Sequence, residues 1–196
     1  MGLSFHYKGK LKDPPSLKKM IEEVTDICQA NQWKYAILDD TFPNNSFTMN
    51  PNKEKVYGIF FTPPKCETVH LTFLSNGRMC AAYNLRLNKD LANLEEDLYL
   101  YFLSVKTQYC GSGIHKLLIP IFDYLSTKYF EDFEFTDEGQ YWETRDEKLL
   151  DEIFERYSNL INSFGSALEH IPILEGESIE NYILRMAEIV KKNNIE

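Results

Sequence analysis

Residues 98–147 constrain the fold of this chain more than any other stretch. An almost unbroken apolar run at 98–105 is followed by a glycine loop at 110–113. Apolar side chains then recur at helical spacing over 114–129, and a short alternating run follows at 132–136. Because strands change face at every residue and helices repeat every 3.6 residues, these spacings predict strand, helix and strand in that order.

Two details of this stretch sharpen the prediction. The run at 98–105 is apolar on both faces, which is typical of a strand inside a sheet that is covered on both sides. In the later strand, Phe133 and Phe135 are expected on the same face. Pro120 lies within the helical segment and lacks the N–H that the helix needs there, so we expect it to bend the helix.

The rest of the chain supplies strands first and helices later. Asp13 and Ser16 flank two prolines and predict the start of a helix, because both side chains can accept hydrogen bonds from free N–H groups. The Asn-Gly pair at 76–77 predicts a tight hairpin turn, since both residues tolerate positive φ. Thr144 and Glu147 fit a capping box at the start of the last third of the chain, which is expected to be helical. The expected strands lie at 3–11, 33–38, 56–61, 69–74 and 78–83, and the other expected helices at 17–29, 144–168 and 178–190.

These elements predict an α+β fold. We expect a mixed, mostly antiparallel sheet with packed helices, and a C-terminal helical pair lying across it. No Gly/Ser linker and no low-complexity run divides the 196 residues. Residues 1–196 are therefore expected to form a single domain, of which residues 143–196 are the helical C-terminal part.

Charge is spread unevenly along the chain. The formal net charge is −9 at pH 7, and residues 131–157 alone carry 11 acidic and 3 basic side chains. Since an acidic surface repels phosphate backbones, this balance argues against nucleic-acid binding. It favours a basic protein as the partner of that segment.

Cysteine spacing and hydropathy bear on the compartment. Cys28, Cys66, Cys80 and Cys110 are far apart and form no C-x-x-C pair, so free and mostly buried thiols are expected rather than a zinc site. No run approaches the roughly 18 apolar residues of a membrane span. The N-terminus has no long apolar core of the signal-peptide kind. We therefore expect a cytoplasmic protein that makes no membrane contact.

A candidate site follows from one geometric assumption. If the strands at 98–107 and 132–136 are parallel neighbours, their carboxyl ends lie on one sheet edge, where open α/β sheets usually bind ligands. Aromatic side chains in the acidic turn that follows would add contact area at little entropic cost. The candidate binding residues at this edge are Lys106, Gln108, Cys110, Ser112, His115, Asp137, Glu138, Tyr141, Trp142 and Glu143.

Three kinds of chemistry at this edge compete with structural roles. The glycine loop at 111–113 opens a helix, so its N–H groups fit an anion, but a tight turn explains it as well. Cys110 with His115 as its base fits an activated thiol, against a structural thiol and a surface histidine. The carboxylates of the acidic turn fit acid–base catalysis or a divalent cation. With no phosphate-loop, metalloprotease or EF-hand motif in the chain, we expect no catalytic residue, no metal and no cofactor.

Two short runs carry a resemblance. Residues 104–108, Ser-Val-Lys-Thr-Gln, and residues 141–144, Tyr-Trp-Glu-Thr, resemble runs in small bacterial proteins of uncharacterised function. The resemblance covers most of the chain. It implies no activity, cofactor or catalytic residue.

Three functions remain open on these grounds. The first is a non-enzymatic binding module that presents the acidic segment 131–157, with Tyr141 and Trp142, to a basic protein partner. The second is a small-molecule enzyme or sensor with a pocket near Lys106, Cys110 and Glu138. The third is a structural homo-oligomer held together by the C-terminal helices, whose apolar stripes are long.

Overall fold

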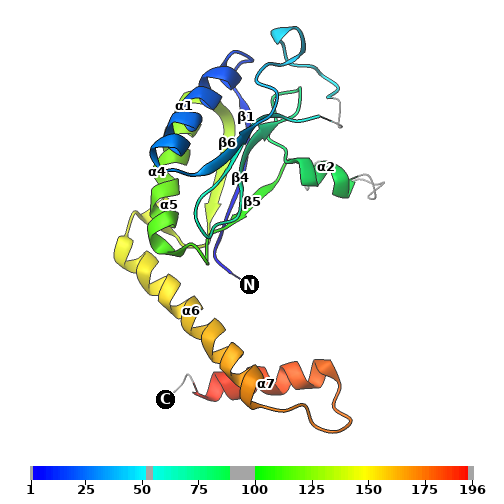
Figure 1. The fold of residues 1–196 in the computed structure, drawn as a ribbon, viewed down its shortest axis with the longest axis vertical. Helices are drawn as coiled ribbons and strands as arrows, with labels where there is room; N and C mark the ends of the chain where they lie inside the picture. Colours follow the sequence, from blue (N-terminus) through cyan, green and yellow to red (C-terminus); the bar gives the residue numbers. More distant parts are fainter. Residues whose placement is uncertain (1, 52–54, 89–99, 194–196) are drawn as a thin grey trace. The chain divides into compact units, whose positions relative to one another are not determined.

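The computed structural model describes residues 2–51, 55–88 and 100–193, and shows an α+β fold (Figure 1). The described strands form two three-stranded sheets, in the orders β5-β1-β6 and β2-β3-β4. All of their ladders are antiparallel, and an isolated parallel bridge joins Asp39 to Tyr57. In chain order the elements are β1 (Ser4–Leu11), α1 (Ser16–Ala30), β2 (Lys34–Ile37), the short 3-10 helix η1 (Pro43–Asn45), β3 (Tyr57–Thr62), β4 (Val69–Phe73), α2 (Ala82–Asn88), β5 (Leu103–Lys106), α4 (Gly111–Tyr129), β6 (Phe130–Asp137), α5 (Tyr141–Thr144), α6 (Glu147–His170) and α7 (Ile179–Asn193).

β1 is the central strand of the first sheet. Its Phe5 pairs with Val105 of β5 on one side and with Asp137 of β6 on the other. Because both neighbours run antiparallel to β1, β5 and β6 point in the same direction, as the site prediction requires. The expectation that they are direct neighbours is wrong, since the first strand of the chain lies between them. Their carboxyl ends nevertheless lie at the same edge of the sheet.

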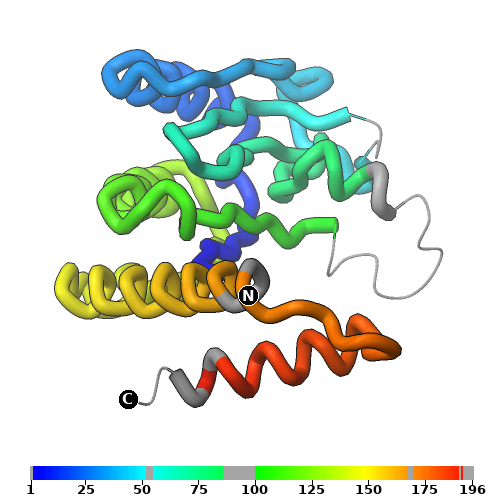
Figure 2. Tube along the Cα trace, turned by 60° about the horizontal axis from the view of Figure 1, so that its bottom comes forward, coloured from blue at the N-terminus to red at the C-terminus, as the bar shows by residue number. Residues whose placement is uncertain are grey.

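The core lies between the strands and two helices. Phe5 and Tyr7 alternate with polar residues along β1 and are fully buried. α1 and α4 contact each other and lie on the same side of the strands (Figure 2). Fully burying an apolar side chain such as that of phenylalanine stabilises the fold by roughly 1.5–3 kcal/mol. α4 contributes Leu118, Ile119, Phe122 and Leu125 to this core, and α1 contributes Leu17, Met20, Ile21 and Val24.

The helix start predicted from Asp13 and Ser16 is confirmed. The carboxylate Oδ1 of Asp13 accepts hydrogen bonds from the N–H of Ser16 at 2.8 Å and from its hydroxyl at 2.9 Å. α1 begins at that serine. α4 likewise forms where predicted and continues through Pro120. The bend expected at this proline stays a prediction.

The apolar run before β5 folds differently from the prediction. β5 begins only at Leu103, lies at a sheet edge, and alternates buried with half-exposed side chains. It is therefore no inner strand covered on both faces. Leu100 and Tyr101 precede β5 and are buried in a second apolar cluster. Residues 98–99, the start of the predicted strand, lie outside the described ranges. The other members of that cluster are Val56, Leu74, Cys80 and Leu85.

The Asn-Gly turn forms, but the strand expected after it does not. The N–H of Leu74 donates to the carbonyl of Arg78, and Gly77 has a φ of +80°. Beyond the turn, the backbone bonds to two different strands. The N–H of Met79 donates to the carbonyl of Gly9 in β1, whereas the N–H of the next residue donates to a carbonyl in β4. No longer ladder develops, and α2 begins at Ala82.

The capping box predicted at Thr144 is also wrong. Thr144 is the last residue of α5, and α6 begins three residues later, at Glu147. The Thr144 hydroxyl donates to the carbonyl of Gln140 at 2.6 Å and accepts the N–H of Asp146 at 3.2 Å. It thus stabilises the turn between the two helices instead of the first turn of α6.

The C-terminal helical pair forms as expected. The Ser178 hydroxyl accepts the N–H of Asn181 at 3.2 Å just before α7, which is the predicted cap. After the turn at 171–178, α7 runs back in the opposite sense to α6 (Figure 2). Tyr182 and Met186 of α7 are buried.

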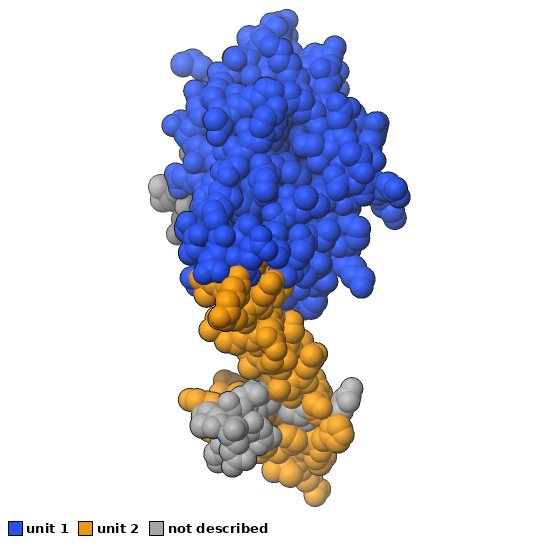
Figure 3. Space-filling model, turned by 90° about the vertical axis from the view of Figure 1, so that its left-hand side faces the viewer, with its two compact units in different colours: residues 1–147 blue, residues 148–196 orange. Residues whose placement is uncertain are grey.

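The chain divides into two compact units, residues 1–147 and residues 148–196 (Figure 3). The first contains both sheets with α1 and α4, and the second contains most of α6 and all of α7. That both units behave as one domain stays a prediction. Among the described helices, none has the length and apolar content that crossing a bilayer requires.

Candidate functional site

The edge where β5 and β6 end is held together by a buried polar network. Thr107 follows β5, His115 lies one turn into α4, and Asp137 ends β6. The Thr107 hydroxyl is 2.8 Å from Nδ1 of His115, and Nε2 of His115 is 3.1 Å from the Asp137 carboxylate. Thr107 and His115 are fully buried and Asp137 is 4% exposed. The two loops therefore meet through His115 although their strands are not adjacent.

Asp137 is the centre of this network. Its carboxylate also accepts the N–H groups of Gly139 at 2.6 Å, Tyr141 at 2.8 Å and Trp142 at 3.0 Å. Burial by itself raises the pKa of Asp137, but the hydrogen bond and charge of His115 together with these backbone donors outweigh it and lower that pKa. Asp137 thus stays ionised and fixes the loop that leads into α5.

The network resembles a hydroxyl–imidazole–carboxylate relay, but it is sealed from solvent. A nucleophile needs access to its substrate, and the Thr107 hydroxyl has none. Both ring nitrogens of His115 are within hydrogen-bond distance of Thr107 or Asp137, so neither can serve Cys110 as a base. The expectation of a surface histidine at 115 is wrong, because α4 turns this side chain inward against Phe5 at 4.2 Å between ring centroids.

Cys110 has a different partner, which the sequence does not indicate. Cys110 is the N-cap residue of α4, and its thiol interacts electrostatically with the thiol of Cys66, from the loop between β3 and β4. Cys66 Sγ is 3.6 Å from the carbonyl oxygen of Lys106, and Cys110 Sγ is 2.9 Å from that of Thr107. The two thiols are therefore held at consecutive carbonyl groups where β5 ends.

The remaining candidates from β5 and α4 lie around this pair. The backbone N–H of Lys106 donates to Glu67 at 2.8 Å, and its ammonium lies 5.2 Å from the ring centroid of Tyr109. Gln108 is buried, whereas Ser112 is half-buried in the first turn of α4. That the glycine loop holds an anion stays a prediction.

The acidic turn is anchored by its aromatic residues. Trp142 is partly buried and packs against Phe135, with ring centroids 4.4 Å apart. Tyr141 is also partly buried against the core. Among Tyr141, Trp142 and Glu143, only Glu143 is exposed. Glu138 is exposed and its Oε2 accepts the N–H of Ser4 at 2.8 Å. Tyr141 and Trp142 therefore hold α5 on the sheet more than they face outward.

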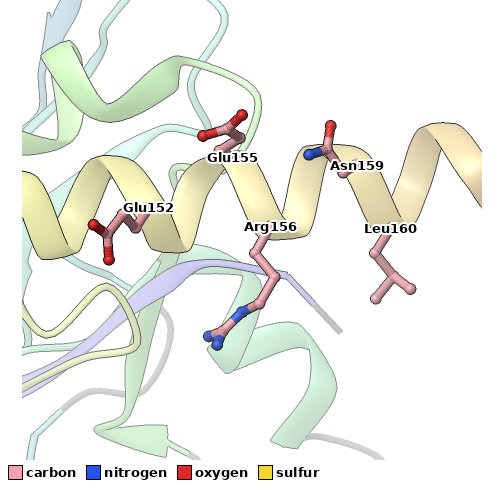
Figure 4. A pocket seen from close by; sticks show the side chains of 5 residues that line it. All are labelled: Glu152, Glu155, Arg156, Asn159 and Leu160. Carbon is pink, nitrogen blue, oxygen red and sulfur yellow. The ribbon is translucent and has the colours of Figure 1, made fainter. Parts of the chain in front are cut away.

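Hollows of the described surface lie elsewhere. One of about 500 Å³ is lined by Leu38, Asp39, Lys55, Val56, Phe60, His70 and Ala82. Another, of about 630 Å³, runs along α6, and Figure 4 shows the side chains that project into it, from Glu152 to Leu160. Neither includes Lys106, Cys110 or Glu138, so the pocket of the second functional hypothesis stays a prediction. Within the described ranges, no group of three or more His, Cys, Asp or Glu residues is arranged to hold a metal ion.

No family model matches this chain, and neither the curated proteins nor the solved structures contain a match. Function has to be argued from the residues themselves.

Proposed function

We propose that this protein is a non-enzymatic binding module whose α6 takes a basic amphipathic segment of a partner protein. The supporting observation is that exposed carboxylates and exposed aliphatic side chains lie together on this helix. Such a surface offers attraction to cations and apolar area to bury.

Three carboxylates of the acidic segment are paired or buried within residues 1–147. Lys8 is 3.0 Å from Glu134 and Lys10 is 2.7 Å from Glu131, so cross-strand ion pairs take up the carboxylates of β6. Asp137 is buried. Exposed carboxylates of residues 131–157 include Glu138 and Glu143 and, on α6, Asp151, Glu152 and Glu155. Of these, Glu152 lies 3.8 Å from Lys148.

The α6 hollow combines this charge with apolar surface. Its lining residues Glu152, Glu155, Arg156, Asn159 and Leu160 recur every three or four positions, so they form one stripe along the helix (Figure 4). Leu160 is 43% exposed, and the adjacent Ile161 is 40% exposed. A helix with lysines beside leucines could pair its charges with the glutamates and its apolar side with Leu160.

The test uses synthetic 18-residue peptides and fluorescence anisotropy at low salt. The probe is a Leu/Lys helix with its leucines on one face, and the controls are a scramble of the same composition and a Leu/Glu helix. We expect micromolar binding of the probe, at least tenfold weaker binding of the scramble, and no binding of the acidic peptide. Replacing Glu152 and Glu155 with Lys should weaken probe binding at least tenfold.

A matched control separates a site from general attraction. Glu22→Lys with Asp26→Lys makes the same change of charge on exposed positions of α1 and should leave affinity within twofold. An equal loss in both double variants, or binding of the scramble as tight as that of the probe, would reject the α6 site. Light scattering that shows a dimer, disrupted by Ile183→Glu on α7, would instead assign the helical unit to a second copy of this chain.

A further inference from the structure

The two thiols at the end of β5 form a second candidate site, independent of the proposed binding function. Cys66 and Cys110 belong to different segments, and both are only partly buried. In contrast, Cys28 and Cys80 are fully buried in the core. The chain therefore holds two half-buried thiols at the consecutive carbonyl groups of Lys106 and Thr107 and keeps the other two cysteines out of reach.

The surrounding contacts hold the pair in place. Glu67, next to Cys66, donates its N–H to the carbonyl of Lys106 at 3.3 Å and accepts the N–H of Lys106 on its carboxylate at 2.8 Å. These two bonds fasten the β3–β4 loop to β5. Cys110 is fixed from the other side, since it is the N-cap of the 19-residue helix α4.

The start of α4 is open at its two glycines. A Cβ atom added at Gly111 or at Gly113 would meet nothing within 4 Å. The two positions that flank Ser112 are thus open, and Gly111 is directly bonded to Cys110. The interaction with Cys66 lowers the pKa of the Cys110 thiol against the effect of burial, and the same interaction raises the pKa of Cys66.

We propose that Cys66 and Cys110 are a peroxide-reactive pair that forms a reversible disulfide. The Cys110 thiolate attacks one oxygen of hydrogen peroxide, the O–O bond breaks, and the products are a Cys110 sulfenic acid and hydroxide, which takes up a proton to become water. The Cys66 thiol then attacks the Cys110 sulfur, the S–S bond forms, and the hydroxyl group leaves as a second water. A dithiol reductant returns both residues to thiols by exchange and is itself oxidised to a disulfide.

Disulfide formation would join the β3–β4 loop to the start of α4 by a covalent bond. Lys106, Tyr109 and Glu67 lie at this junction, so oxidation would fix the surface that they form. In reducing compartments, disulfides of this kind are usually transient and report oxidant levels.

The sequence makes the experiment direct, because trypsin releases the four cysteines in separate peptides, at 20–34, 66–78, 79–86 and 107–116. The full-length reduced protein is treated with a tenfold excess of hydrogen peroxide, blocked with N-ethylmaleimide under denaturing conditions, digested and analysed by mass spectrometry without reduction. We expect peptide 66–78 linked to peptide 107–116, with the loss of two hydrogens, and the link should disappear with dithiothreitol. The other two cysteines should carry the maleimide.

Two variants test the order of events. With Cys66→Ser, the sulfenic acid on Cys110 has no resolving thiol and should be captured by dimedone. With Cys110→Ser, the rate of peroxide consumption should fall at least tenfold. The proposal is overturned if wild-type protein gives no 66–110 link, if the link forms only between two differently isotope-labelled chains, or if Cys28 and Cys80 oxidise as fast. The wild-type measurement decides even if a variant fails to fold.

Discussion

Asp137 shows how one buried carboxylate can organise a sheet edge. Its partners are the ring of His115 and three backbone N–H groups, and all of them are donors. A buried charge is tolerated only when it is satisfied in this way. The residue therefore acts as a structural anchor between β6, α4 and α5.

Replacing Asp137 with Asn should lower the free energy of unfolding by about 3 kcal/mol. The amide NH₂ would face a donor and lose one charge-assisted hydrogen bond, which leaves a buried group unpaired. Urea unfolding followed by circular dichroism at pH 7 measures the difference. The control Glu143→Gln alters an exposed side chain and should stay within about 0.5 kcal/mol of wild type.

The pH dependence of this difference has a defined sign. The pKa of Asp137 is lower in the folded protein than in the unfolded chain, where an aspartate titrates near about 3.9. Its contribution is thus fully present above roughly pH 5 and is lost as the pH falls through the folded pKa. The gap between wild type and Asp137→Asn should narrow from pH 5 to pH 3. A constant gap would show that the carboxylate charge contributes nothing.

At the level of elements, both the Thr107–His115–Asp137 network and the thiol pair depend on α4. It carries Cys110 at its N-cap and His115 on its buried face, while its apolar stripe packs under β1. The helical spacing predicts this element well, because its apolar residues repeat over many turns. Pro120 is the one residue that opposes it, since it removes a hydrogen bond within the helix.

Pro120→Ala should therefore stabilise the protein. Pro120 is exposed, so alanine loses no core packing, and it restores the helical N–H. Part of the gain is offset because proline also restricts the unfolded chain. We expect a net increase of about 2 kcal/mol in the free energy of unfolding by urea titration. Leu117→Ala, an exposed substitution in the same helix, is the control and should not stabilise. Unchanged or lower stability of the proline variant would contradict the prediction.

At the level of the whole molecule, the two units differ in how much they bury. The main core contains residues from β1 through α5, all within residues 1–147. In α7, by contrast, Ile179 is 73% exposed and Leu184 is 59% exposed. An element with few buried contacts opens at a lower free energy than the core.

Hydrogen exchange should report this difference. Amides of β1 and α4 are expected to exchange at least about 100-fold more slowly than those of α7 in the free protein. Mass spectrometry of peptic fragments provides the measurement. Adding the basic amphipathic peptide should slow exchange in α6 while leaving α4 unchanged. Equal protection of α4 and α7 without peptide would show that the units share one level of stability.

Several features were determined by the sequence alone. The strand at 3–11, the helical stripe of α4 and the Asn-Gly turn were all predicted, because each depends on neighbours within a few residues. The common direction of β5 and β6 was assumed for the site prediction, and the structure shows it. That the candidate residues at this edge bind a ligand stays a prediction.

Only the tertiary structure decided how distant segments meet. β1 lies between β5 and β6, Thr107 and Asp137 share His115, and the thiols of Cys66 and Cys110 lie at consecutive carbonyl groups. No local pattern indicates such pairs, because they are set by how the whole chain closes its core and satisfies its buried polar groups. For the same reason the ion pairs of Lys8 with Glu134 and of Lys10 with Glu131, between the first and last strands, appear only in the structure.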